Sequence, residues 1–253
     1  MILIKPSFEI WTPVAQIQAC IIKIEKAGRI CYKSESPERW DETKKFVTSL
    51  IKKGHESVIE HFNITVKFVV DRGVTHELVR HRLASYSQES TRYCNYKGGV
   101  TFIIPPWTNF LSGTFTDSSN CVEYWDSTKS ERIWFCAMVN AEADYQNLLK
   151  EGWTPQQARS VLPNSLKTEI VMTANLREWR HVFKLRTSPA AHPQMREIMM
   201  PLLEEFKRLI PAVFDDIEAG YKEANKKPFI PSFQEGTGSG GEQKNPCTPR
   251  VLV

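Results

Sequence analysis

The chain has 253 residues with 33 Lys and Arg against 29 Asp and Glu, which gives a formal net charge of +4. Hydrophobic residues make up 41% and charged residues 25%, as is ordinary for a globular protein. No apolar run approaches the ~20 residues that span a bilayer, and the first residues lack a secretory signal. The small net charge is too weak to argue for nucleic-acid binding. The six cysteines form no C-x-x-C pair, which argues against a zinc ribbon or a disulfide scaffold. We therefore expect free thiols and a cytoplasmic protein that binds neither a membrane nor nucleic acid.

The hydrophobic pattern predicts helices and strands without a sustained βαβ alternation. Helical spacing and helix-end signals predict helices over residues 13–26, 38–53, 74–83, 130–151, 155–162, from 175 and from 193. Alternating apolar residues predict strands over residues 62–70, 100–104 and 166–172. A turn is expected at 71–73 and a polar surface loop at 107–129. This order favours an α+β fold, an antiparallel sheet with flanking helices, over a doubly wound parallel sheet.

Several helix ends carry specific signals. Ser130 is expected to cap the long helix, and Thr154 with Pro155 and Gln157 predicts a capping box with proline at the first helical position. Asn175 is expected to cap the helix that follows it. Pro201 should kink or break the helix that begins near residue 193.

No repeat or linker divides residues 1–227, which we expect to form a single domain. Residues 228–253 are rich in Gly, Ser and Pro and are expected to form a flexible C-terminal tail. The chain contains neither G-x-G-x-x-G nor the P-loop motif. If it binds a nucleotide, it therefore does so without a Rossmann turn or a P-loop.

The segment from Arg80 to Arg92 holds three Arg and one His, interleaved with hydroxyl and amide side chains. Guanidinium groups match phosphates and carboxylates, so the segment suits a phosphorylated small molecule. A solvated helix face is the structural alternative. Two features weigh against it: the segment directly follows an apolar strand and turn, and it contains no lysine.

Two further clusters hold candidate ligand-binding groups. His55 and His61 lie six residues apart, which is not the H-E-x-x-H spacing of a zinc site, so a helix end with polar caps is the favoured interpretation. In the second cluster His181 and Arg186 would point about 140° apart on a regular helix. They serve one ligand only if the helix ends between them. Otherwise they serve different ligands or different copies of a site.

Taken in order, these segments resemble the family of flavin-dependent thymidylate synthases. Arg80-His81-Arg82, seven residues and then Ser90 match its R-H-R-x7-S signature. The flanking matches are 54–57 with 60–61, 158–163, 175–177 and 185–186, so the resemblance covers about residues 14–210.

The resemblance implies an enzyme that methylates dUMP to dTMP. Methylenetetrahydrofolate supplies the carbon, NADPH is the reductant through FAD, and the enzyme is a homotetramer whose active sites are shared between subunits. The matching positions expected to contact FAD are Ser57, Arg80, His81, Arg82, Gln88, Asn175, Arg177 and His181. Those expected around dUMP are Glu77, Arg80, Gln88, Glu89, Ser90, Thr91, Arg92, Arg159 and Arg186.

The resemblance also implies a catalytic set of Arg186, Ser90 and His55, without a metal. Arg186 beside the pyrimidine would stabilise negative charge that develops at N3 and O2. His55 is expected near the flavin and the folate. Ser90 is expected to contact dUMP, because a covalent role would need an adjacent base that the sequence does not identify.

Two other functions stay open at this point. A nucleotide- or RNA-binding module could use the same arginine-rich segment, with Tyr86, Tyr93 and Tyr96 stacking on bases. It would bind nucleic acid in a strongly salt-dependent manner. A metal hydrolase built on His55 and His61 lacks a plausible ligand set.

Overall fold

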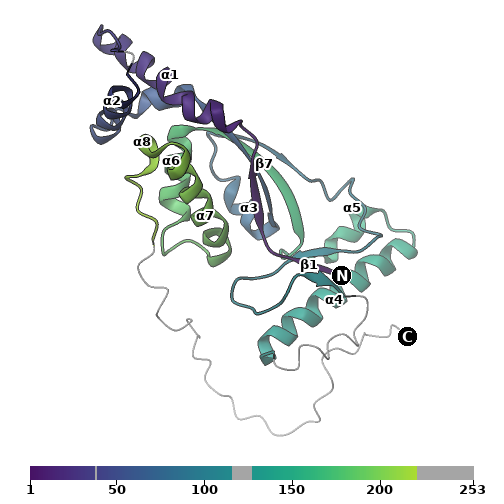
Figure 1. The fold of residues 1–253 in the computed structure, drawn as a ribbon. Coiled ribbons are helices and arrows are strands. Elements are labelled where there is room, and N and C mark those ends of the chain that lie inside the picture. Colours follow the sequence, from purple (N-terminus) through teal and green to yellow (C-terminus); the bar gives the residue numbers. More distant parts are fainter. Residues whose placement is uncertain (38, 116–126, 221–253) are drawn as a thin grey trace.

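The computed structural model describes residues 1–37, 39–115 and 127–220 (Figure 1), so the expected tail at 228–253 lies outside the described residues. The helices are α1 (Val14–Tyr32), α2 (Trp40–Lys52), α3 (Arg72–Leu78), α4 (Lys129–Lys150), α5 (Pro155–Ala158), α6 (Leu176–Arg186), α7 (Pro193–Leu209) and α8 (Pro211–Phe214). Two 3-10 turns are η1 (Glu56–His61) and η3 (Arg159–Val161). The strands are β1 (Ile2–Ile4), β2 (Ser7–Ile10), β3 (Asn63–Asp71), β4 (Ala84–Gln88), β5 (Thr101–Ile103), β6 (Gly113–Thr114) and β7 (Lys167–Asn175). The mixture of helices and sheets confirms the predicted α+β class.

The larger sheet has the strand order β2-β3-β7-β4, and every neighbouring pair is antiparallel. The two long strands pair along their whole lengths, from Asn63 opposite Asn175 to Asp71 opposite Lys167. Alternate residues of β3 are buried, as the sequence pattern predicts, and they contribute to a core with α1, α2, α6, α7 and α8. Figure 1 shows α6, α7 and α8 grouped beside these strands, with α1 and α2 at the same end. Trp179 lies at the centre of this core, with ring centroids 5.7 Å from Phe183 and 5.2 Å from Phe206.

A second, smaller sheet has the order β5-β1-β6. Its strands pack with α4 and α5 around a separate hydrophobic cluster that includes Phe102, Phe135 and Tyr145. Here β1 pairs with β5 in parallel, so the expectation of antiparallel strands is wrong for this pair. Strands β1, β2 and β6 were not predicted, because such short strands carry too few residues for a periodic pattern to stand out.

The segment after β3 differs most from the sequence prediction. Instead of a turn at 71–73, Asp71 caps α3 directly, and its Oδ1 accepts a hydrogen bond of 2.8 Å from the Val74 N–H. The helix ends at Leu78, five residues before the expected end, and residues 84–88 form strand β4 on the edge of the larger sheet. The arginine-rich segment therefore begins in a turn and continues as a strand, which excludes a solvated helix face.

Two other local expectations need correction, and a third is confirmed. The N-cap of α4 is Thr128, and Glu131 completes its capping box, so Ser130 lies inside the helix. Helix α7 continues from Pro193 to Leu209 with Pro201 inside it, so no break occurs there. The short helix behind Thr154 is confirmed, with Gln157 Oε1 accepting from the Thr154 N–H at 2.9 Å.

The cysteines do not all match the expectation of free thiols. Cys20, Cys31 and Cys94 are free, whereas Cys136 in α4 is disulfide-bonded.

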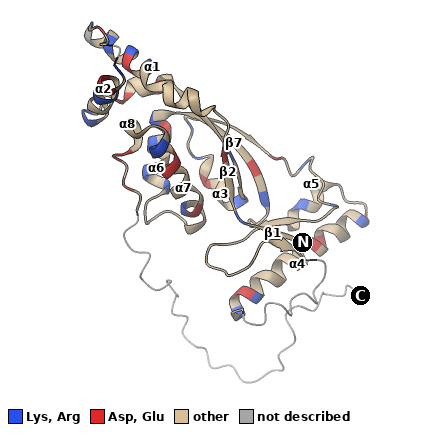
Figure 2. Ribbon diagram, viewed as in Figure 1, with Lys and Arg blue, Asp and Glu red and all other residues tan. Residues whose placement is uncertain are grey.

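Within the described ranges no helix is long and apolar enough to cross a membrane. Basic and acidic residues are interspersed along α2, α4 and α6 (Figure 2), so none of these helices carries charge of a single sign.

Candidate active site

A pocket of about 580 Å³ lies where β7 passes into α6. Asn175 ends the strand and caps the helix, because its Oδ1 accepts from the Glu178 N–H at 2.8 Å. Three residues expected to contact FAD line this pocket: Asn175, Arg177 and His181. The other lining residues are Glu56, Glu60, Leu83, Glu178, Arg180 and Lys184.

Ion pairs connect α6 to η1 across the pocket. Arg177 pairs with Glu60 at 2.5 Å, and Arg180 pairs with Glu56 at 3.0 Å. Arg177 is half exposed at 53%, whereas Arg180 is buried at 3%. His55 and Ser57, also expected near the flavin, are exposed at the start of η1, which packs against α6.

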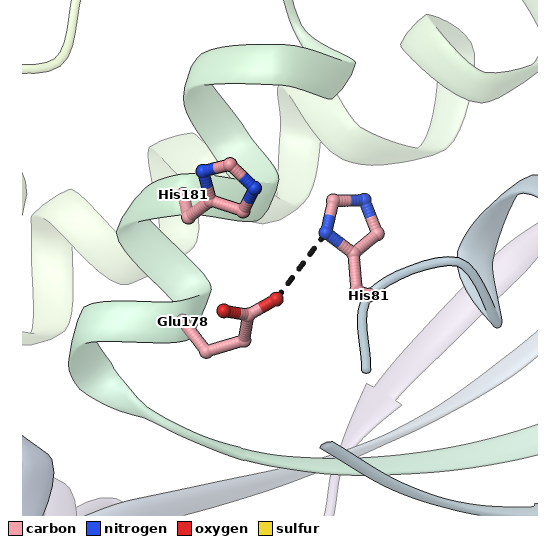
Figure 3. A group of neighbouring side chains, drawn as sticks. All are labelled: His81, Glu178 and His181. Carbon is pink, nitrogen blue, oxygen red and sulfur yellow. Dashed lines mark ion pairs between the residues drawn. The ribbon is translucent and has the colours of Figure 1, made fainter. Parts of the chain in front are cut away.

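His81, Glu178 and His181 converge beside the pocket (Figure 3). His81 Nδ1 lies 3.3 Å from Glu178 Oε1, and both residues are buried. The His81 and His181 rings meet edge to face with centroids 5.6 Å apart. Burial lowers the pKa of His81 to about 4, and the positive charge of Arg186 acts in the same direction. Burial also raises the pKa of the Glu178 carboxyl.

Arg186, at the end of α6, is held by three acceptors. Its Nε donates to His81 Nε2 at 3.0 Å, Nη1 donates to Glu77 Oε2 at 2.7 Å, and Nη2 donates to the Glu77 carbonyl at 3.0 Å. A guanidinium has five N–H groups. One N–H on each terminal nitrogen is thus left without a protein acceptor within the described residues.

A second group of predicted residues lies at the far end of β4. Arg159 Nη1 donates to the buried Thr91 hydroxyl at 2.9 Å, and Ser90 Oγ accepts from the Arg92 N–H at 3.3 Å. Glu89 accepts from the Tyr96 hydroxyl at 2.8 Å and from Lys167 Nζ at 3.1 Å. The second group therefore combines two exposed arginines with hydroxyl groups.

The two groups are separated by the length of β4. Ala84 pairs with Ala174 near the pocket, whereas Gln88 pairs with Ile170 further along β7. Four strand residues span about 13 Å. Gln88 donates to the hydroxyls of Thr75 and Thr168, at 3.0 and 3.3 Å, and does not line the pocket. Arg80 and Arg82 are exposed in the turn between α3 and β4.

Sequence reasoning missed two features of the site. Glu178 occupies a position typical of a helix capping box, so its sequence position suggests only a local role. Lys167 begins β7 and pairs with Glu169 in the same strand and with Glu89 just after β4, and no signal in the sequence indicated a function for this lysine. The group that could hold a metal ion within the described residues is His81, Glu178 and His181, with ligand atoms within 4.8 Å of one another. It contains neither His55 nor His61.

The fold and the site define an α+β protein with a polar pocket at a strand–helix junction and an arginine anchored beside it. Residues 18–212 match the model of the family described as thymidylate synthase complementing protein, and the chain belongs to this family. This identification confirms the predicted family and the predicted enzyme class.

Relatives with the name flavin-dependent thymidylate synthase occur in mycobacteria. The one from Mycobacterium sp. (strain JLS) is 34% identical over 201 residues, which are 77% of this chain and 79% of the relative. The one from Mycobacterium bovis (strain BCG / Pasteur 1173P2) is 36% identical over 203 residues, with 77% and 78% covered.

Solved structures with the same fold include the UMP/dUMP methylase PolB from Streptomyces cacaoi, bound with 5-Br dUMP. The TM-score is 0.64 at 24% identity, with 85% of this chain and 96% of that chain covered. The same protein bound with 5-Br UMP gives a TM-score of 0.62 at 22% identity.

Proposed function

We propose that this chain methylates dUMP to dTMP, with methylenetetrahydrofolate as carbon donor and NADPH as reductant, using FAD. The observation that carries this proposal is the family match, because residues 18–212 include every predicted site residue, from His55 to Arg186. The cytoplasmic location stays a prediction.

The residues of the pocket fit a flavin nucleotide in size and chemistry. Arg177, His181 and the amide of Asn175 offer hydrogen-bond donors along a pocket of about 580 Å³. Arg177 is paired with Glu60, so a bound phosphate would have to displace this carboxylate. Arg80 and Arg82 are exposed nearby and supply further positive charge. Hydride transfer is the chemistry that a bound flavin supplies.

Arg186 is proposed to polarise the pyrimidine. C5 of uracil is a poor nucleophile until electron density enters the ring, and a fixed cation at N3 and O2 stabilises that charge. The anchored guanidinium fits this role, since its two remaining N–H groups lie on neighbouring nitrogens, as a bidentate contact needs. Glu77 then contributes by holding Arg186.

Arg92 and Arg159 are proposed to bind the dUMP phosphate together with the hydroxyls of Ser90 and Thr91. A covalent role for Ser90 is disfavoured, because its hydroxyl accepts from the Arg92 N–H, and no basic side chain bonds to it among the described residues. His55 is proposed to lie near the flavin and the folate.

We also propose a homotetramer whose active sites combine residues of different subunits. The support is the separation of the two groups: Arg186 lies by the pocket, whereas Arg92 and Arg159 lie at the far end of β4. A site completed by a second subunit would join them. Co-expression of an Arg186→Ala chain with an Arg159→Ala chain should then restore part of the activity that each variant lacks. No restoration would contradict shared sites.

The activity is tested on the purified protein by its spectrum and by NADPH oxidation. We expect a yellow protein whose visible spectrum changes with dUMP, and NADPH oxidation coupled to dTMP formation only when dUMP and methylenetetrahydrofolate are both present. A colourless protein that cannot be reconstituted with FAD would count decisively against the proposal.

Arg186→Ala tests the assigned role of the guanidinium. We expect the flavin to stay bound while turnover falls by about 10²–10³-fold, as when an electrostatic donor is removed from an active site. Arg208→Ala is the matched control, because Arg208 is exposed and pairs with Glu205 in α7. Normal turnover in Arg186→Ala would refute the role.

A further inference from the structure

The carboxylate of Glu178 is buried against an imidazole instead of completing its helix cap. Only 6% of Glu178 and 4% of His81 are exposed. Asn175 caps α6 through its own side chain, while Glu178 Oε1 points at His81 Nδ1 across 3.3 Å (Figure 3). A buried carboxylate is costly unless it is paired, so this orientation requires a compensating interaction with His81.

The contacts of the two ring nitrogens of His81 determine which nitrogen carries its proton. A guanidinium can only donate, so His81 Nε2, which receives the Arg186 Nε–H at 3.0 Å, must present a lone pair. A neutral imidazole then carries its hydrogen on Nδ1, which faces the Glu178 carboxylate. The contacts form one chain from Glu178 through His81 to Arg186 and on to Glu77.

We propose that Glu178 is a positioning residue, acting through His81 to hold the Arg186 guanidinium in the orientation that polarises the substrate. This inference rests on the function proposed above for Arg186. A carboxylate that fixes the tautomer and orientation of a histidine serves the same purpose in hydrolase triads, where it never receives the proton itself. Here the histidine accepts from an arginine, so the carboxylate orients a cation instead of a nucleophile.

The same three side chains could alternatively hold a divalent cation, since the nearest ligand atoms of His81, Glu178 and His181 lie within 4.8 Å. Two observations favour the positioning role. Both nitrogens of His81 already have partners, and the positive charge of Arg186 lies 3.0 Å from one of them, where it would repel a metal ion.

The test compares Glu178→Met with Glu178→Gln in the flavin-loaded enzyme. Methionine fills a similar volume but cannot accept from Nδ1–H, whereas the glutamine amide oxygen can. We expect kcat to fall 10–100-fold in the methionine variant, as when the second partner of a ligating histidine is removed. We expect the glutamine variant to stay within about fivefold of wild type, with flavin content equal in both. Glu205→Met, at an exposed salt bridge in α7, is the matched control and should leave kcat unchanged.

A double-mutant cycle identifies the route of the effect. Methionine at position 186 has no N–H group that could donate to His81 Nε2, so Glu178→Met should lower kcat by less than twofold in an Arg186→Met background. Equal fold-losses in both backgrounds would show that Glu178 acts independently of Arg186 and would overturn the proposal.

A measurement that does not depend on turnover comes from ¹⁵N NMR of the imidazole. The wild type should show His81 as the Nδ1–H tautomer, and this signature should weaken in Glu178→Met. An Nε2–H tautomer in the wild type would overturn the proposal, as would activity that is lost on chelation and restored by Zn²⁺. If the wild type itself fails to methylate dUMP, the proposed function fails. If the wild type is active and Glu178→Met equals it, only this inference fails.

Discussion

Arg180→Met tests the connection that holds α6, and with it the site, against the last described helix. The guanidinium donates to Asp216 Oδ1 and Oδ2 at 2.6 and 2.7 Å, to Glu56 Oε1 at 3.0 Å and to the Val213 carbonyl. Only 3% of the Arg180 side chain is exposed. The substitution leaves the buried Val213 carbonyl without this donor and removes the countercharge of two carboxylates.

The loss in free energy of unfolding depends on how far water can replace the contacts that Arg180 makes. Removing one partner of a buried ion pair costs about 3–5 kcal/mol. Asp216 is 48% exposed and Glu56 22%, so solvent compensates both carboxylates in part. We therefore expect Arg180→Met to lower the free energy of unfolding by about 3 kcal/mol, the lower end of that range.

The ion pair also gives this effect a pH dependence. Hydrogen bonding to Arg180 lowers the pKa of Asp216 below its ordinary value. The folded state then binds fewer protons than the unfolded state, so the stabilisation is present above the ordinary pKa of ~3.9. It is lost as the pH falls through the lowered value. The difference in stability between wild type and Arg180→Met should accordingly shrink in strong acid.

Urea unfolding followed by far-UV circular dichroism measures both effects. Arg208→Met is the matched control, since Arg208 is 63% exposed and the loss of its surface ion pair should leave the free energy of unfolding nearly unchanged. If Arg180→Met costs less than about 1 kcal/mol at neutral pH, the reasoning about the buried network is refuted.

Substitutions at two buried positions, His81 beside the pocket and Asp71 at the start of α3, give further predictions. His81→Asn should make the free energy of unfolding less dependent on pH. The pKa of His81 in the folded state is about 4, below the ordinary 6.5, so the wild type loses up to about 3 kcal/mol of stability as the pH falls from 6.5 to 4. A variant whose stability falls equally steeply would contradict this expectation. Asp71→Ala should lower the free energy of unfolding by about 2 kcal/mol, because Asp71 caps α3 and accepts a hydrogen bond from Gln194 Nε2 at 2.8 Å. Asp71→Asn keeps the cap and should retain most of the stability in the same urea titration.

The long strands could be predicted from the sequence because burial imposes their alternation. Ile64, Val66, Phe68 and Val70 all face the core, and a strand with one buried face repeats every second residue. Strand β4 could not be found in this way. Its residues are small or polar and at most half-buried, and the strand exists because it pairs with β7. That partner lies far along the sequence, so no local pattern reveals the pairing.

The site was predictable only as a set of positions. The family resemblance placed Arg186 and His81 among the ligand-binding residues, but neither the motif nor the spacing indicated that they contact each other. Their contact depends on the early end of α3, which places His81 in a buried turn while its neighbours Arg80 and Arg82 are exposed. Three consecutive cationic or titratable residues therefore have different environments for a reason that appears only in three dimensions.

Glu178 illustrates why local rules are insufficient at such a site. At its sequence position a glutamate commonly bonds back to the start of the helix, but Asn175 alone satisfies the cap here. The carboxylate is buried, so pairing with His81 avoids the cost of an isolated buried charge, whereas a second cap contact would leave His81 Nδ1 without this acceptor. Burial, which the tertiary fold determines, thus decides between two contacts of Glu178 that the sequence alone permits equally.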